Sequence, residues 1–492
     1  MGALLGSLGG ALACTATLVD DAPCRAHADC RESFGFGSQC GDDGLCTAPT
    51  LHPRCGRAVP ADLLDEPTKY VDRIVLGSLY SFDDHEDTLL ATELAVRQVN
   101  ALDGLDGRQF AMVHCDYTPG ATDDLDDLND IEAVEELAPY LADVIGVPLI
   151  VGPRGSGRTE ATFEALRDHD TVVISPSATS PSLTDLEDPP SDAAPGRLWR
   201  TAPPDSLQGE VIARDLLERA IVNAAVVYQT GAYGDGLSDL FAARFSQEGG
   251  TVALFPFAPG GGFSVTVAQV GQGIAEDKFQ EVLFISSDID DYVSFLRAAT
   301  ASSSLRDQFA NQLGADDEGG LFFPDTAFTT QLLEETFETS AELFANIRGT
   351  RPAPAEGVVF NAFAAAYTST FNQSSTGSAF TPHSYDAAWV GIYAIAWSVL
   401  HSGDIDGAGI GLGLRRISEG TPVDILPDSW PLVLQAFGAG TPIDVRGASG
   451  ALDYDPVTEE TVSAIERWQI VADGSTPSGF AFARIDVIDP GD

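Results

Sequence analysis

The chain has 492 residues, and its 74 acidic against 26 basic residues give a formal net charge of −48. This charge excludes a nucleic-acid surface as the main function, because phosphates would be repelled over most of the molecule. Hydrophobic residues make up 44% of the chain and charged residues 20%, which is typical of a globular protein rather than of a disordered acidic tail. At about 150 residues per domain the length suggests roughly three units, which two lobes and a small additional segment would fit.

The amino-terminal residues predict export and a lipid anchor. Residues 1–13 are apolar and small, and they end directly at Cys14. The stretch Leu12-Ala13-Cys14 resembles the lipobox of bacterial lipoproteins, in which the signal peptide is removed before a cysteine that then carries the lipid. We therefore expect a signal peptide over 1–13, a lipidated Cys14, and a location in the periplasm or on the cell surface. The sequence contains no run of about 18 apolar residues, so a membrane-spanning helix is not expected.

Six further cysteines predict three disulfides. An even number of cysteines suits an oxidising compartment, and the six are Cys24, Cys30, Cys40, Cys46, Cys55 and Cys115. The first four lie in a short polar stretch that cannot bury much core and would need covalent support. A zinc site is disfavoured because no CxxC-like spacing occurs. If the first four cysteines pair among themselves, Cys55 and Cys115 are left as the third pair. We expect residues 14–57 to form a lipid-anchor and cysteine-rich segment.

The main body predicts an α/β fold. From residue 74 onward, apolar stretches typical of strands alternate with stretches of helical periodicity, and the same rhythm restarts after about residue 206. Strands separated by helices form parallel sheets, which bind ligands at the carboxyl ends of their strands. Two long apolar helices are expected near 358–371 and 382–400, with their aromatic residues in the core. The glycine-rich stretch 407–413 is expected to be a loop.

Several strings in order along the chain resemble one family. GSLYSF at 77–82, VISPSATSPSLTD at 173–185, VVYQTGAYGDGL at 226–237, YDAAW at 385–389 and GASGALDYD at 447–455 are similar to type I periplasmic solute-binding proteins of the leucine/isoleucine/valine-binding group. The resemblance covers roughly residues 73–471. It implies two Rossmann-like lobes, with 71–203 and 356–446 in lobe 1 and 204–350 and 452–488 in lobe 2. The chain would cross between the lobes near 201–206, 348–356 and 446–452.

The resemblance also implies a ligand site between the lobes. Ser156 matches a hydroxyl that binds the ligand carboxylate, and Ser177 and Thr179, with Ala178 between them, match contacts to an amino acid's carboxylate and ammonium. Tyr233 matches a tyrosine that covers the ligand from the second lobe. Asp325 is the expected partner of a ligand ammonium. Tyr80 and Ser81 are expected at the rim, and Asp288 is a further acidic candidate.

One string admits other interpretations. Residues 152–159 read GPRGSGRT, which matches the phosphate loop G-x-x-x-x-G-K-[ST] except that Arg158 replaces the lysine. A planar guanidinium does not substitute for the compact ammonium of that motif, so a nucleotide hydrolase is the least favoured function. A glycine-rich loop at a helix N-terminus also suits a small carboxylate. Arg154 and Arg158 either strengthen that anion site or face solvent to balance the acidic surface.

The sequence gives no support for an enzyme. It lacks a G-x-S-x-G string and an H-E-x-x-H pair, and the acidic run at 123–130 lacks the pattern of a calcium-binding loop. We expect no cofactor and no metal. The expected function is capture of a small polar solute, such as an amino acid, for an ABC permease. The alternative is a surface lipoprotein that senses a ligand and acts through a protein partner.

Overall fold

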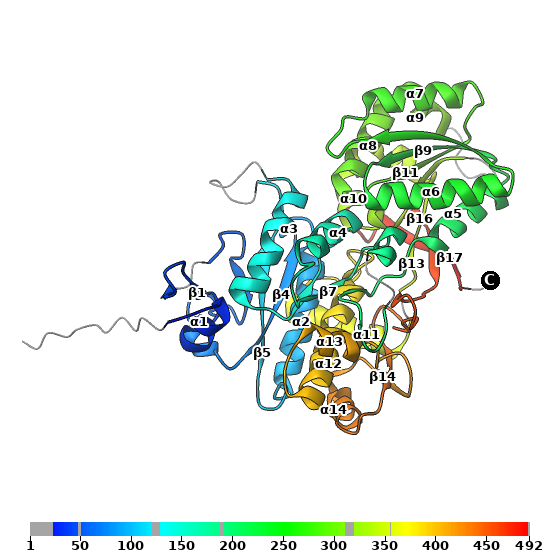
Figure 1. The fold of residues 1–492 in the computed structure, drawn as a ribbon. Coiled ribbons are helices and arrows are strands. Elements are labelled where there is room, and N and C mark those ends of the chain that lie inside the picture. Colours follow the sequence, from blue (N-terminus) through cyan, green and yellow to red (C-terminus); the bar gives the residue numbers. More distant parts are fainter. Residues whose placement is uncertain are drawn as a thin grey trace, which may run out of the picture.

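The computed structural model describes residues 23–47, 51–120, 128–186, 190–309, 319–354 and 356–490. Two lobes lie next to each other, each with a central sheet and helices around it, and a small segment at the start of the described chain lies against the first lobe (Figure 1). The predicted signal peptide, Cys14 and most of the acidic run at 123–130 fall outside the described residues. None of the described helices has both the length and the apolar character that a membrane crossing needs.

Lobe 1 is built on a six-stranded sheet with the order β3-β5-β4-β6-β7-β8. Its strands are β3 (Arg57–Val59), β4 (Ile74–Tyr80), β5 (Phe110–Asp116), β6 (Leu149–Val151), β7 (Val172–Ser175) and β8 (Leu198–Arg200). All neighbours are parallel except β3, which runs antiparallel to β5. Strands β6 and β7 are buried along their whole length, as expected of parallel strands covered on both faces.

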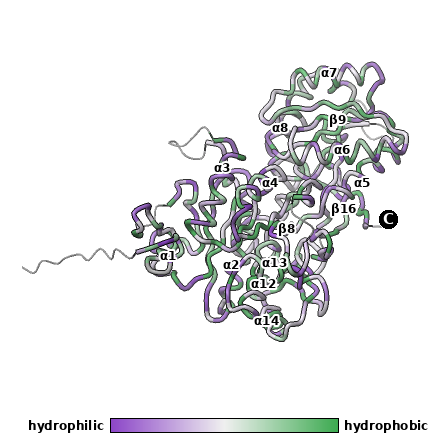
Figure 2. Tube along the Cα trace, viewed as in Figure 1, coloured by the Kyte–Doolittle hydropathy of each residue, from purple (hydrophilic) through white to green (hydrophobic). Residues whose placement is uncertain are grey.

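Helices from two separate parts of the chain cover this sheet. They are α2 (Glu86–Ala101), α3 (Asp130–Pro139), the π-helix η2 (Tyr140–Ile145), α4 (Ser156–Ala165), η3 (Pro181–Asp185), α11 (Val358–Phe371), α12 (Thr381–Ser402), α13 (Gly407–Leu414), η6 (Pro427–Ser429) and α14 (Trp430–Gly438). Residues 381–398 of α12 are all buried, and its Tyr393 stacks on Trp430 at 5.9 Å between ring centroids. The prediction that these aromatic residues form core is confirmed. Figure 2 shows hydrophobic stretches around α12 and α13 and a mostly hydrophilic α1.

Lobe 2 contains a seven-stranded sheet with the order β10-β9-β11-β12-β13-β16-β17. The strands are β9 (Asn223–Gln229), β10 (Thr251–Phe257), β11 (Glu281–Ile285), β12 (Leu321–Phe323), β13 (Ile347–Pro352), β16 (Ile465–Ala472) and β17 (Phe480–Ile488). The first five are parallel, and β16 is antiparallel to both of its neighbours. The helices are α5 (Ser206–Glu218), α6 (Ala232–Gln247), α7 (Ser264–Ala275), α8 (Ile289–Ala301), α9 (Ser303–Phe309), η5 (Asp325–Ala327) and α10 (Thr330–Phe344). The predicted α/β class with parallel sheets is confirmed.

The chain passes between the lobes after β8, after β13 and before β16. The third passage comes later than the expected 446–452. Leu452 and Tyr454 belong to the lobe 1 core, where Tyr454 packs edge-on against Trp199 at 5.0 Å, and a short parallel pair, β14 (Thr421–Asp424) with β15 (Ile443–Arg446), precedes them. Lobe 1 also begins before the expected residue 71, because β3 pairs with β5.

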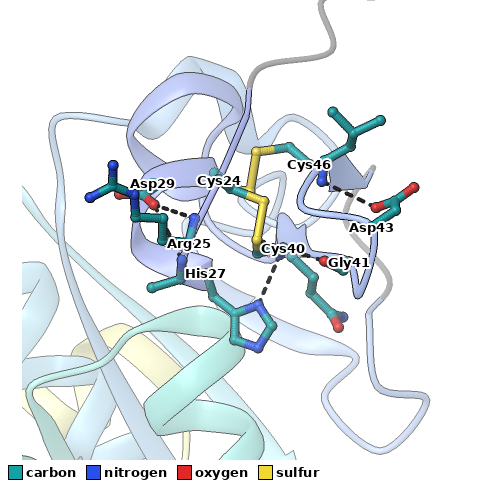
Figure 3. The surroundings of a disulfide bond; sticks show 12 residues. Cys24, Arg25, His27, Asp29, Cys40, Gly41, Asp43 and Cys46 are labelled. Atoms are coloured by element: carbon teal, nitrogen blue, oxygen red, sulfur yellow. Dashed lines mark hydrogen bonds between the residues drawn. A yellow bond between two sulfur atoms is a disulfide. The ribbon is translucent and has the colours of Figure 1, made fainter.

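The disulfide-rich segment is a compact unit attached to lobe 1. It contains α1 (His27–Phe34) and a small antiparallel pair, β1 (Gln39–Cys40) with β2 (Cys46–Thr47), and η1 (Pro67–Tyr70) follows it. Cys24 is bonded to Cys40 and Cys30 to Cys46, while His27 Nδ1 accepts a hydrogen bond of 2.9 Å from the Cys40 N–H (Figure 3). Cys55 is bonded to Cys115 of β5. The three predicted disulfides, including the pair obtained by subtraction, are confirmed.

The prediction of a loop at 407–413 is wrong, because these residues belong to helix α13 (Gly407–Leu414). The Asp406 carboxylate caps the helix by accepting a hydrogen bond from the Gly409 N–H. Glycine is needed for packing rather than for a turn: a Cβ at Gly413 would lie 2.7 Å from the Ala394 backbone of α12. Close helix contact therefore outweighs the low helix propensity of glycine here.

Candidate functional site

The two sheets present the carboxyl ends of several parallel strands to the same cleft. In lobe 1, the loops that follow β6 and β7 carry Arg154 and Ser177. In lobe 2, the segments that follow β9 and β12 carry Tyr233 and Asp325. All four residues line one cavity. The cavity measures about 20 Å³, which is room for a single water molecule, and the lobes are joined beside it by the Arg158–Asp288 and Ser180–Ala232 contacts, so they are closed at this point.

Ser156, the first residue of α4, organises the loops of lobe 1. Its side chain is fully buried, and Oγ accepts hydrogen bonds from the N–H groups of Thr179 (3.2 Å) and Ser180 (3.1 Å). The Ser177 Oγ in turn accepts a bond of 3.1 Å from the Gly155 N–H. The structure therefore brings Ser156, Ser177 and Thr179 together as predicted, with Ser177 on the cavity and Ser156 behind it.

Gly155 shapes the entrance to helix α4. Its φ of 81° lies in the left-handed region that favours glycine, and a Cβ there would lie 2.7 Å from Arg158 Nη2. The positive end of α4 thus lies at the cleft, where the Gly155 N–H donates to Ser177 Oγ and the Arg158 side chain folds back so that its Nε donates to the Arg154 carbonyl oxygen at 2.7 Å. This arrangement suits a small anionic group.

Thr179 points toward the first passage between the lobes. Its Oγ1 donates a 2.9 Å hydrogen bond to Asp205, whose N–H is bonded to the Thr179 carbonyl oxygen at 2.8 Å. Asp205 is fully buried, and its Oδ1 has no hydrogen-bond partner among the described residues. Burial raises the pKa of Asp205 well above its ordinary value, and the charge of Asp325 raises it further. The site therefore contains two carboxyl groups that interact.

Tyr233 and Asp325 form a buried pair on lobe 2. The tyrosine hydroxyl donates to Asp325 Oδ1 at 2.5 Å, and the Thr326 N–H donates to the same oxygen at 2.8 Å. The other oxygen, Oδ2, is buried and has no partner in the described part of the chain. Burial raises the pKa of the Asp325 carboxyl to about 6. An unsatisfied carboxylate oxygen in a closed cavity is costly unless a cation reaches it.

The two arginines of lobe 1 differ. Arg154 is 9% exposed, its guanidinium lies 5.5 Å from the Phe380 ring centroid, and its buried Nε has no hydrogen-bond partner within the described ranges. Arg158 is instead paired: its Nη1 lies 2.6 Å from Asp130 of lobe 1 and 3.1 Å from Asp288 of lobe 2. Neither arginine faces solvent, so that interpretation is wrong. Because Arg158 is held by two carboxylates, it is not placed as the cation of a phosphate loop.

Besides Ser156 and Thr179, two further predicted ligand-binding residues do not line the cavity. Tyr80 is fully buried, and its hydroxyl is 3.1 Å from Thr92 Oγ1 of α2. Ala178 is also buried, and its carbonyl oxygen accepts a 3.2 Å bond from Arg200 Nη1. Neither lines the cavity. Ser81 and Asp288 line a larger neighbouring cavity of about 400 Å³.

Several cavity residues were not identified from the sequence. His85, Ser287, Thr326 and Phe380 all line the cavity. Ser287 is the second residue after β11, so a search of every strand end would have found it. Phe380 precedes α12 and reaches the cleft only because the chain has returned from lobe 2, and no local pattern marks it.

Comparison with known proteins identifies the fold. Residues 87–426, well over half of the chain, match the family model described as the receptor family ligand binding region. The chemotactic signal transduction system substrate-binding protein BasB of Halobacterium salinarum is 24% identical over 437 residues, or 82% of this chain and 88% of BasB.

Solved structures agree with this result. The leucine binding protein LivK of Thermotoga maritima has a TM-score of 0.61 at 16% identity, covering 85% of this chain and 99% of LivK. A solute binding protein of an R. palustris ABC transporter, in complex with 4-hydroxybenzoate, has a TM-score of 0.62 at 12% identity. The match covers 85% of this chain and 97% of that protein. The chain therefore belongs to the receptor ligand-binding-region family and has the type I periplasmic-binding fold of the leucine/isoleucine/valine-binding group.

Proposed function

We propose that this chain binds a small amino-acid-like zwitterion between its lobes, outside the cytoplasm, for delivery to an ABC permease. One observation carries the proposal: Arg154 and Asp325, of opposite charge, line one cavity between the lobes, and each has a buried side-chain atom, Arg154 Nε and Asp325 Oδ2, that has no hydrogen-bond partner among the described residues. A ligand carboxylate near Arg154 and a ligand ammonium near Asp325 would satisfy both. The names of relatives and structural neighbours, which include substrate-binding and leucine-binding proteins, support the ligand class.

The chemistry is binding without reaction. The ligand carboxylate accepts hydrogen bonds from Arg154 and from the start of α4, where the helix dipole adds to the attraction. The ammonium donates to Asp325 Oδ2, while Tyr233 keeps the other oxygen occupied. Ser177 supplies a hydroxyl beside both. No cofactor or covalent step is required, and the ligand leaves unchanged.

Ligand entry requires the lobes to separate. The cavity holds about one water molecule, which is far too small for an amino acid. The three passages act as the hinge, and the ligand stabilises the closed form because only that form offers it contacts from both lobes. The side chains that line the cavity move apart to admit it.

A thermal-shift screen of the purified full chain tests the proposal. The panel contains amino acids, their deaminated acids, their decarboxylated amines, and 4-hydroxybenzoate. A ligand at 100 times its Kd adds about 2.7 kcal/mol to the free energy of unfolding, which is readily measured. We expect stabilisation by at least one amino acid. Stabilisation by none of the zwitterions would contradict the proposal.

Sensing is a second candidate function, favoured by the disulfide-rich segment. This unit docks on lobe 1, where Arg31 Nη1 donates to the carbonyl oxygens of Asp143 and Val144, and solute delivery alone does not need it. BasB is named as part of a chemotactic signalling system. A photo-crosslinking residue at exposed Thr47 would distinguish the two functions in cells. Capture of permease subunits would support transport, and ligand-dependent capture of a signalling receptor would support sensing.

A further inference from the structure

A second polar cavity lies at the opposite edge of the lobe 1 sheet from the cleft. It has a volume of about 290 Å³, and its lining includes Arg73 and Ile74 at the start of β4, Arg108 just before β5, and Pro148 just before β6. These are the amino ends of parallel strands, whereas the cleft lies at their carboxyl ends. Arg31 and Phe36 of the disulfide-rich segment complete one wall. Figure 1 places this segment on the side of lobe 1 away from lobe 2.

Three arginines line this cavity without a carboxylate partner. Arg73 Nη1 donates to the Phe110 carbonyl oxygen at 2.8 Å, Arg108 Nε donates to that of Asp72 at 3.0 Å, and Arg31 Nη1 donates to two carbonyl oxygens of η2. None of the three forms an ion pair with a carboxylate of the described residues, and no aspartate or glutamate is among the cavity-lining residues. In a chain with 74 acidic and 26 basic residues, a cavity that is lined by three arginines and by no carboxylate is a local exception to the overall charge.

The surrounding structure fixes two of these guanidinium groups. Arg31 lies against Gly146, where an added Cβ would come within 2.4 Å of Arg31 Nε. Arg73 lies over the ring of Tyr70 at 4.9 Å, and the Tyr70 hydroxyl donates to Asp62 at 2.5 Å. Burial lowers the pKa of Arg31, against the opposing effect of Asp143. The Asp143 carboxylate is itself 3.0 Å from His169 Nε2.

We propose that this cavity is a binding site for a phosphate ester, with the phosphate on the three guanidinium groups. Each guanidinium keeps N–H donors beyond those already bonded to backbone, and arginine donors match phosphate oxygens in pairs. The apolar side chains of Phe36, Ile145 and Ile405, which share the cavity, accommodate an apolar substituent. The phosphate belongs either to a lipid headgroup or to a soluble ester.

The position of the cavity makes both sources reasonable. It borders the segment that leads toward Cys14, which the sequence predicts to be lipidated, and a tethered chain would hold this edge of lobe 1 near lipid headgroups. A soluble phosphate ester would bind the same three groups. The site is independent of the cleft, because the two cavities share no lining residue.

Calorimetric titration of the full chain tests this site. The probes are sodium phosphate, glycerol 3-phosphate and dihexanoyl phosphatidylglycerol, at about 20 mM salt so that screening is weak. We expect binding of phosphate esters, weakened about tenfold by Arg73→Gln and by Arg108→Gln. The matched control is Arg297→Gln, which removes the same charge from the surface of lobe 2, where Arg297 lies near Glu335.

The outcomes separate the two sources. Binding of the short-chain lipid at least tenfold tighter than glycerol 3-phosphate, with sedimentation on phosphatidylcholine vesicles only when they contain phosphatidylglycerol, assigns the site to a lipid headgroup. Equal or tighter binding of glycerol 3-phosphate assigns it to a soluble ester. If no probe binds, or if the Arg73 and Arg108 variants bind as tightly as Arg297→Gln, the site does not exist.

Discussion

The guanidinium of Arg158 joins the two lobes, because its Nη1 lies 3.1 Å from Asp288 Oδ1 across the cleft. Arg158 belongs to α4 of lobe 1 and is almost fully buried, while Asp288 directly precedes α8 of lobe 2. Gln229 Nε2 donates to the other Asp288 oxygen at 2.9 Å, and this orients the carboxylate toward Arg158. This ion pair and the Ser180 Oγ bond to the Ala232 carbonyl oxygen, at 2.7 Å, stabilise the closed arrangement.

We expect Arg158→Gln to shift the chain toward an open arrangement. The Arg158–Asp288 pair is partly screened by water, because the Asp288 side chain is 38% exposed. A partly exposed pair contributes about 1 kcal/mol, which changes the ratio of open to closed molecules about fivefold. Small-angle scattering should show a larger radius of gyration without ligand. Arg297→Gln, which alters a pair within lobe 2, should leave it unchanged, and equal radii for both variants would refute the assigned role.

Asp325→Asn is expected to abolish most of the affinity for an amino acid. The variant keeps the size of the side chain but removes the charge that pairs with the ligand ammonium, so affinity should fall about 30-fold or more. Calorimetry measures the change directly. The control is Asp239→Asn on the exposed face of α6, which changes the net charge equally and should bind normally. Normal binding by Asp325→Asn would show that this carboxylate is not the ammonium partner.

Ligand affinity should depend on pH through Asp325. Burial raises its pKa to about 6 in the closed, ligand-free structure, and an ammonium lowers the pKa because it favours the ionised form. Affinity should therefore be constant above about pH 7 and fall up to tenfold per unit below about pH 6, with proton release on binding. Tyr233→Phe removes a hydrogen bond that lowers this pKa, so the fall should begin at higher pH. Calorimetry in two buffers of different ionisation enthalpy detects the released proton.

A flat profile between about pH 5 and about pH 8, in the wild-type chain and in Tyr233→Phe alike, would contradict this assignment. Asp239→Asn again serves as the control, because its exposed carboxylate is not expected to affect the midpoint.

The disulfides should differ in what they stabilise. Cys55 and Cys115 are 60 residues apart, and they join the start of lobe 1 to β5, the second strand of its sheet. The loop-closure model predicts that Cys55→Ser with Cys115→Ser lowers the free energy of unfolding by about 4 kcal/mol. Cys24→Ser with Cys40→Ser should loosen the small segment and leave the unfolding midpoint of the lobes nearly unchanged. Urea unfolding followed by tryptophan fluorescence distinguishes the two, since the described tryptophans include Trp199 and Trp389 of the lobe 1 core and Trp468 of the lobe 2 core.

Much of the fold follows from local patterns in the sequence. Buried parallel strands such as β6 and β7 are short apolar runs between helices. Cys55 and Cys115 could be paired by subtraction once Cys14 and the four clustered cysteines were set aside. Helix α13 was missed because its glycines serve contact with α12, and propensity contains no information about that neighbour. The end of lobe 1 was misplaced because Tyr454 packs on Trp199, more than 250 residues earlier in the chain.

The location of the site could be predicted from the sequence, but the pairing of its side chains could not. Loops after strand ends placed Ser177, Tyr233 and Asp325 on one cavity. The pairing of Arg158 with Asp288 joins residues 130 positions apart on different lobes, and no spacing rule predicts it. Arg154 and Arg158 were equivalent in the sequence and differ in the structure, because Arg158 is paired with Asp130 of lobe 1 as well as with Asp288 of lobe 2.

Calorimetric titration of one amino acid that binds, beside its deaminated acid and its decarboxylated amine, tests the central claim most directly. Arg154 Nε and Asp325 Oδ2 have no hydrogen-bond partner in the described part of the chain. This predicts that only the zwitterion binds tightly, because each analogue leaves one buried charge unsatisfied. We expect each analogue to bind at least about 30-fold more weakly. Equal binding of the deaminated acid or of 4-hydroxybenzoate would contradict the claim and would assign the cleft to simple carboxylates.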